Sequence, residues 1–188
     1  MTKKKFEITG VTLKTELKIS LLFGVCFLFF WAVSIYFYYT FNHLESITHI
    51  PFYIFFCAMF LGFAWGLLIA RVLGKKMRVK YLFEISDHHI TTQTENKSLF
   101  YTFDYAGTEL FSLVGTAENM RLFKIISGRE KFKIRLGTYG LAPFSEKIDI
   151  KTMDNMLIEL EPVLKNNGFT DKKVKTPNNI FEYRYIKY

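Results

Sequence analysis

Two long apolar segments constrain this chain more than any other feature of its sequence. Ile19–Phe41 spans 23 residues and Ile50–Ala70 spans 21, and neither contains a charged residue. At about 1.5 Å per residue, each would form a helix of about 32–36 Å, long enough to cross a hydrocarbon layer of about 30 Å. A buried helix of a soluble protein normally keeps a polar face, and both segments are apolar all round. The sequence therefore predicts two transmembrane helices, at 19–41 and 50–73.

The first segment is expected to stay in the mature protein as an anchor. The apolar core of a cleaved signal peptide is about 7–15 residues long and ends at small residues. Here the apolar run is longer and closes on four aromatic residues, Tyr36–Tyr39. Aromatic side chains are typical of the interface between membrane and water.

Basic residues flank the two segments on one side only. Residues 1–18 contain five Lys and two Glu, whereas residues 42–49 contain one Glu and no Lys or Arg. Residues 71–80 contain no acid and five basic residues: Arg71, Lys75, Lys76, Arg78 and Lys80. The positive-inside rule then predicts a multi-pass protein of the inner (plasma) membrane, with both termini cytoplasmic and an external loop at 42–49. The five basic residues are expected to fix this orientation and to contact anionic lipid headgroups.

The net charge of +8 does not indicate nucleic-acid binding. Residues 81–188 contain 15 basic and 14 acidic side chains, so nearly all of the excess charge lies beside the apolar segments. A basic surface of that kind favours the lipid bilayer as a partner. We expect no nucleic-acid partner.

The second apolar segment carries a stripe of small residues. They recur at every fourth position: Ala58, Gly62, Gly66 and Ala70. Small residues in this register let two transmembrane helices approach closely. The short loop favours packing of this stripe against the first helix of the same chain, and a homodimer through the stripe is the alternative.

The cytoplasmic part alternates between apolar and polar residues, as β-strands do. Closely spaced strands without intervening helices predict an antiparallel sheet, rolled or sandwiched. The expected strands are 79–86, 89–94, 99–105, 109–114, 120–127 and 130–136, with turns at 87–88, 95–98 and 128–129. A helix is expected over 151–167, capped by Thr152 or Asp149, kinked or split at Pro162 and stopped by Asn166-Asn167-Gly168. Residues 170–188 are expected to form a polar tail whose last nine residues add an edge strand or rest on the membrane.

The order of these elements resembles a pleckstrin-homology-like domain. The stretches that carry the resemblance are YLFEISDHHITT, LFYTFDY, FKIRLGTYG and MDNMLIELEPVLKNNG. The layout of residues 19–169 resembles bacterial two-span membrane proteins that hold such a domain just inside the membrane. The resemblance implies a small antiparallel barrel or sandwich with a C-terminal helix at 74–169, joined to a membrane hairpin in an α+β protein. It implies a scaffold or interaction role and no catalytic residues.

No set of residues predicts an enzyme, a metal site or a cofactor site. Asp87-His88-His89 resembles one motif of metal-dependent phosphoesterases, but such sites need further Asp and His ligands. The chain has four His, and two of them fall in the external loop. Adjacent residues of a strand also point to opposite faces. A hairpin turn explains this motif better.

Four basic residues alternate along one expected strand: Arg129, Lys131, Lys133 and Arg135. On a strand they share one face and could bind anionic headgroups or a protein partner. An ordinary solvated sheet face is the competing interpretation.

The sequence thus predicts a non-enzymatic membrane protein that presents an interaction domain at the cytoplasmic surface. Its partners would be anionic lipid or a protein that the sequence does not identify. Two alternatives stay open at this point. One is an oligomeric pore or effector assembled through Gly62 and Gly66, and the other is an immunity-type protein that acts against a membrane-targeting toxin.

Overall fold

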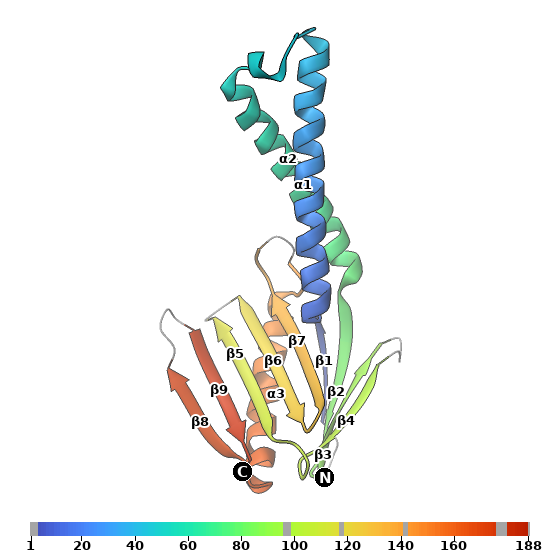
Figure 1. Cartoon of the computed structure of the whole chain (residues 1–188). Helices are drawn as coiled ribbons and strands as arrows, with labels where there is room; N and C mark the ends of the chain where they lie inside the picture. The colour runs from blue at the N-terminus through green and yellow to red at the C-terminus, as the bar shows by residue number, and fades with distance from the viewer. Residues whose placement is uncertain (1–3, 96–98, 117–118, 141–142, 176–179, 188) are drawn as a thin grey trace. The chain divides into compact units, whose positions relative to one another are not determined.

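The computed structural model describes residues 4–95, 99–116, 119–140, 143–175 and 180–187, without the side chains of 173–175. The chain forms two compact units, residues 14–76 and residues 1–13 with 77–188. The helical unit contains most of α1 (Leu13–Phe41), a short 3-10 turn (Ile47–His49) and α2 (Phe52–Met77). The sheet unit contains β1 (Lys4–Gly10), β2 (Val79–Ile85), β3 (His89–Thr94), β4 (Phe100–Asp104), β5 (Leu110–Thr116), β6 (Met120–Ser127), β7 (Glu130–Gly137), α3 (Lys147–Asn166), β8 (Thr170–Lys175) and β9 (Ile180–Ile186) (Figure 1).

Both helices of the helical unit are long and apolar enough to cross a membrane. α1 begins six residues before the predicted span, and α2 continues to Met77. Few side chains of either span are buried, and large apolar residues such as Leu21, Phe29 and Phe60 are mostly exposed. Apolar surface of this extent is stable in lipid and costly in water.

The two glycines of the small-residue stripe in α2 lie against α1 of the same chain. Ala58, Gly62, Gly66 and Ala70 are all buried. A Cβ atom at Gly62 would lie 2.7 Å from the Phe27 carbonyl oxygen, and one at Gly66 would lie 3.1 Å from the Phe23 ring. The stripe is therefore covered within one chain, as the short loop favours.

β1 was not anticipated by the sequence interpretation. Residues 4–10 were assigned to a basic N-terminal segment (1–18), whereas they form a strand that pairs antiparallel with β2 from Lys4↔Ile85 to Gly10↔Val79. The hairpin of α1 and α2 therefore interrupts the connection between two neighbouring strands of one sheet. Both ends of the hairpin leave this sheet at the same place, where Gly10 lies opposite Val79.

The strands form two antiparallel sheets, in the orders β1-β2-β3-β4 and β7-β6-β5-β9-β8. All six predicted strands are present, and the turns at 87–88 and 128–129 connect them as expected. Part of the predicted turn at 95–98 lies outside the described residues. Among the described strands β4 does not pair with β5, and the sheets meet at one isolated bridge, Val11↔Arg135. The sheet unit is therefore not a closed barrel, one of the two forms expected, and consists of two antiparallel sheets around one core.

Aromatic side chains fill the space between the two sheets. Phe132 of β7 lies at the centre of this cluster and is almost fully buried. Its ring centroid lies 5.9 Å from that of Tyr81, 6.0 Å from Phe83, 5.7 Å from Tyr101 and 6.2 Å from Phe103. Centroid separations of 4.5–7 Å are those at which aromatic pairs attract. Burial also raises the pKa of the Tyr81 hydroxyl to about 12, because the charged form would lose its hydration.

α3 completes the core on the inner face of the five-stranded sheet (Figure 1). It begins at Lys147, four residues earlier than predicted, and Thr152 lies inside the helix and does not cap it. Asp149 holds the helix start instead, because its carboxylate accepts bonds from the backbone N–H groups of Glu146 (2.7 Å) and of Thr9 in β1 (2.8 Å). The helix continues through Pro162 and ends at the predicted stop, where Gly168 has φ of 85°.

The C-terminal residues belong to the fold. The sequence interpretation treats 170–188 as a tail and allows an edge strand in its last nine residues. A strand, β9, does form there, but it pairs with β5 along its whole length and with β8 on its other side, so it is not an edge strand. Tyr185 of β9 is fully buried. The helix is therefore followed by two strands that widen the second sheet.

Arg121 fixes α3 to this sheet. Its guanidinium is almost fully buried and forms two bonds to Asp154 of α3, of 2.7 and 2.8 Å. The same group donates to the backbone oxygens of Thr116 (2.6 Å) and Met120 (2.8 Å) and lies over the ring of Phe181. A buried arginine is tolerated here because its donors have acceptors.

Candidate functional site: the basic face of the five-stranded sheet

The outer face of the five-stranded sheet is the candidate site. Alternate residues of each strand point away from the core, which takes the inward side chains, for example Phe123 and Ile134. The basic outward residues of the described strands are Lys124, Lys131, Lys133, Arg135, Lys172 and Arg184. Glu182 is the one carboxylate among the outward residues of these strands. We call this surface the basic face.

Strand register aligns four of these cations in one row. Lys133 lies opposite Lys124, and Lys124 lies opposite Ser112. Ser112 in turn lies opposite Arg184, and Arg184 lies opposite Lys172. Since neighbouring strands are about 4.8 Å apart, this basic row crosses all five strands over about 19 Å.

The charges of the row act on one another. The pKa of Lys124 is lowered, first by partial burial and then by the nearby charges of Lys133, Lys131 and Arg184, while Glu182 opposes the shift. A lowered lysine pKa means that the surroundings make the charged form less favourable than it is in water. An anion bound beside Lys124 would relieve this repulsion.

Glu182 compensates only one cation of the row, Arg184. Its carboxylate accepts a bond of 2.9 Å from Arg184 and one of 3.3 Å from the Ser112 hydroxyl. Lys124, Lys133 and Lys172 form no ion pair with any carboxylate of the described residues. The basic face therefore keeps an excess of positive charge.

Aliphatic rows flank the basic row on both sides. On one side Leu122 lies opposite Val114, and on the other Ile126 lies opposite Leu110, which lies opposite Ile186. All five side chains are half-buried. No outward residue of the described strands in this sheet is aromatic, although 18% of the chain is.

The structure places three of the four predicted strand cations on this face. Lys131, Lys133 and Arg135 lie on β7, whereas Arg129 lies in the turn before it. Lys124, Lys172 and Arg184 were missed. The alternation of β6 could have indicated Lys124, but only the strand order shows that β8 and β9 continue the row.

The predicted membrane-proximal cations divide between the two units. Arg71, Lys75 and Lys76 are exposed residues of α2, and the last two stand in its final turn, where positive charge suits the helix dipole. Arg78 and Lys80 belong to the sheet unit. Arg78 approaches Glu146 at 3.8 Å, and Lys80 approaches Glu95 at 3.7 Å.

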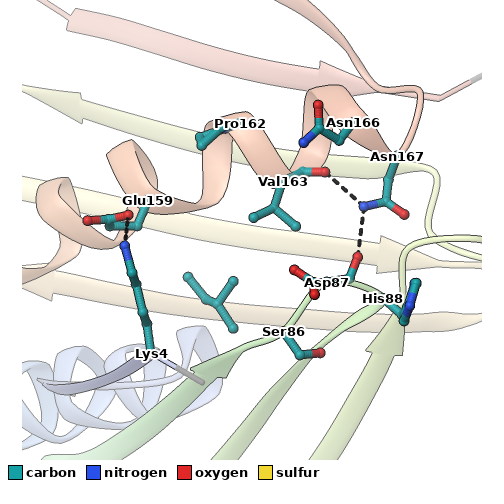
Figure 2. A pocket seen from close by; sticks show the side chains of 10 residues that line it. Lys4, Ser86, Asp87, His88, Glu159, Pro162, Val163, Asn166 and Asn167 are labelled. Carbon is teal, nitrogen blue, oxygen red and sulfur yellow. Dashed lines mark hydrogen bonds and ion pairs between the residues drawn. The ribbon is translucent and has the colours of Figure 1, made fainter. Parts of the chain in front are cut away.

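A second feature of the sheet unit is a groove of about 550 Å³ between α3 and the β2–β3 turn (Figure 2). Ile85, Pro162 and Val163 supply its apolar lining. At one side Lys4 forms an ion pair with Glu159, and at the other the Asn167 amide donates to the backbone oxygen of Asp87 at 3.0 Å (Figure 2).

The groove contains the motif that resembles a phosphoesterase signature. Asp87 and His88 are exposed residues of the turn, and His89 begins β3. The Ser86 hydroxyl donates to the His89 carbonyl oxygen at 2.8 Å and so belongs to the turn itself. Among the described residues, no three His, Cys, Asp or Glu side chains gather in a way that could hold a metal ion.

Comparisons with models of known protein families and with curated protein sequences find no match. The function must therefore be argued from the residues of this chain.

Proposed function

We propose that the chain is a non-enzymatic protein of the inner membrane that holds a pleckstrin-homology-like interaction domain at the cytoplasmic surface. The pairing of β1 with β2 carries this proposal. Because the two strands are partners, the chain must enter and leave the membrane on the same side. The helical hairpin then works as an anchor built into the domain.

The charge distribution supports the cytoplasmic side. Lys14 and Lys18 begin the first span, and Arg71, Lys75 and Lys76 end the second. The connection between the spans contains Glu45 and no lysine or arginine. Cytoplasmic loops carry this excess of basic residues.

The order of elements supports a pleckstrin-homology-like domain. Four consecutive antiparallel strands form one sheet, the next three belong to the second, and α3 follows. This chain would differ from a simple domain of that kind in two ways. Its first strand precedes the membrane hairpin, and β8 and β9 extend the second sheet.

The residues of the two candidate surfaces favour binding over catalysis. The basic face offers cations and aliphatic side chains, and in the groove Lys4 and Glu159 pair with each other. The alternative of a pore assembled through Gly62 and Gly66 is disfavoured, because α1 covers that stripe within the chain. No feature of the described residues favours the immunity-type alternative.

Labelling from each side of the membrane tests this proposal. Single cysteines are introduced at Ser46, in the loop, and at Tyr139, which is exposed in the sheet unit, after Cys26 and Cys57 are replaced by alanine. In intact cells, a membrane-impermeant thiol reagent should label position 46 and spare position 139. In inverted membrane vesicles the pattern should reverse. Labelling of position 139 in intact cells, or release of the protein from membranes by alkaline carbonate, would refute the proposal.

A further inference from the structure

We propose that the basic face binds an acidic amphipathic segment of a partner protein. This inference rests on the proposed function and names the class of partner that the anchored domain recognises. It depends on the register of the five-stranded sheet, which places charged and aliphatic rows side by side on one surface. The helix of the sheet unit, α3, packs on the opposite face and leaves this surface uncovered by that helix.

Charge complementarity requires an anionic partner. Six outward cations face one outward carboxylate, and that carboxylate is already bonded to Arg184 and Ser112. The lowered pKa of Lys124 agrees with this geometry: partial burial is its largest cause, and the nearby charges of Lys133, Lys131 and Arg184 add to the shift. A bound carboxylate would be attracted by several lysines at once and would stabilise their positive charges.

The aliphatic rows require a partner that is also apolar. Leu122 and Val114 flank the basic row on one side, and Ile126, Leu110 and Ile186 flank it on the other. A polyanion without apolar groups would leave these side chains in water. A peptide with an acidic stripe bordered by aliphatic residues would cover the three rows together.

The composition of the face favours a protein segment over the bilayer surface. Peripheral membrane-binding surfaces combine lysine and arginine with tryptophan, phenylalanine or leucine that enter the headgroup region. In this aromatic-rich chain, the outward residues of the described strands in the sheet include no aromatic side chain, and the aliphatic ones are only half-exposed. A face of this kind can pack against a partner but presents no aromatic side chain to insert into lipid.

The spacing of the row fits an acidic helix. On a helix, residues four apart have Cβ atoms about 5–6 Å apart, close to the 4.7–4.9 Å between neighbouring strands. A helix of about 20 residues is about 30 Å long and would span the whole row. Its glutamates would lie over Lys133, Lys124 and Lys172.

Peptide binding to the full-length protein tests the inference. The protein is placed in nanodiscs of zwitterionic lipid, and binding of a fluorescent peptide of about 20 residues is followed by anisotropy. The peptide carries glutamates at every third or fourth position with leucines beside them. We expect binding, and we expect the Lys124→Glu/Lys133→Glu variant to weaken it roughly tenfold or more.

Two matched controls distinguish binding at the basic row from a general effect of the protein's net charge. Lys147→Glu/Lys151→Glu makes the same charge change at exposed positions of α3, away from the basic face, and should leave the affinity unchanged. A peptide with lysines in place of glutamates should bind the Lys124→Glu/Lys133→Glu variant better than the original protein. Thermal unfolding of each variant verifies that its fold is intact.

Three results would overturn the inference. One is the absence of binding to the glutamate–leucine peptide, and another is equal binding of a peptide whose leucines are replaced by serine. The third is binding of anionic vesicles through Lys124 and Lys133 in preference to the peptide, which would identify the bilayer as the partner. The thiol-labelling pattern tests the membrane anchor separately, so a correctly oriented protein that fails these assays would refute only this inference.

Discussion

Replacing residues 12–77 with the dipeptide Asp-Gly is expected to convert the protein into a folded, water-soluble domain. The replacement leaves a four-residue loop, Val11-Asp-Gly-Arg78, between Gly10 and Val79, which are already antiparallel partners. Loops of four residues are common in β-hairpins. The shortened chain should be monomeric without detergent and should show a sheet-dominated circular dichroism spectrum and one cooperative unfolding transition.

The expectation follows from how the sheet unit is held together. Ile8 and Val11 are buried in this unit, and the backbone of Thr9 is bonded to Asp149 (2.8 Å) and to the Ser145 hydroxyl (2.6 Å). All of these contacts survive the replacement. The exposed apolar surface of α1 and α2, in contrast, is removed.

A chain of residues 77–188 is the matched comparison. It lacks β1, so it loses the edge strand of the first sheet and leaves the buried side chains of β2, such as Tyr81 and Phe83, partly uncovered. Exposed strand edges of this kind aggregate. We expect this chain to be insoluble or unfolded. If it folded as stably as the shortened chain with Asp-Gly, β1 would not be part of the domain.

Phe132→Ala is expected to destabilise the soluble domain by about 3–5 kcal/mol, the range for removing a buried phenylalanine ring. Phe132 comes from the second sheet, whereas the four rings around it come from β2 and β4 of the first. Its loss would therefore leave a cavity between the two sheets. Urea unfolding of the shortened chain measures the effect as a shift in midpoint at constant slope.

Tyr139→Ala is the control for this substitution. Tyr139 is 66% exposed, so its loss should change the free energy of unfolding by less than about 0.5 kcal/mol. Equal effects of the two substitutions would mean that the sheets do not share a core at Phe132. An effect of Phe132→Ala below about 1 kcal/mol would mean the same.

The sequence was most informative where a short-range pattern decides the structure. The two apolar runs predicted both long helices, because each run has the length and composition of a segment that can cross a membrane. Alternation predicted the six strands from β2 to β7, and β6 was predicted to the residue at Met120–Ser127. The stop at Asn166–Gly168 also followed from local chemistry.

Sequence reasoning failed where pairing joins distant segments. β1 contains alternating Phe6, Ile8 and Gly10, a weak signal beside the lysines that precede it. Its partner β2 follows the helical hairpin in the sequence, so no local pattern indicates the pairing. The same holds for the basic row, because Arg184 and Lys133 share a face only through the strand order of the sheet.

A cross-strand disulfide in the full-length protein tests the central claim most directly. The test uses a protein in which Cys26 and Cys57 are replaced by alanine. In it, Lys5→Cys and Glu84→Cys would place thiols on directly paired residues of β1 and β2. The Cα atoms of such a pair lie within the range of 4.4–6.8 Å that a disulfide needs. Thr91 pairs with Glu84 from the other side, so Lys5→Cys with Thr91→Cys would put the thiols two strands apart, at about 9.6 Å. After oxidation in native membranes and cleavage at a protease site introduced in the 42–49 loop, the two halves of the first variant should stay joined until reduced. Separation of its halves without reduction, or equal linkage in the Lys5–Thr91 variant, would contradict the account of a membrane hairpin inserted between two paired strands.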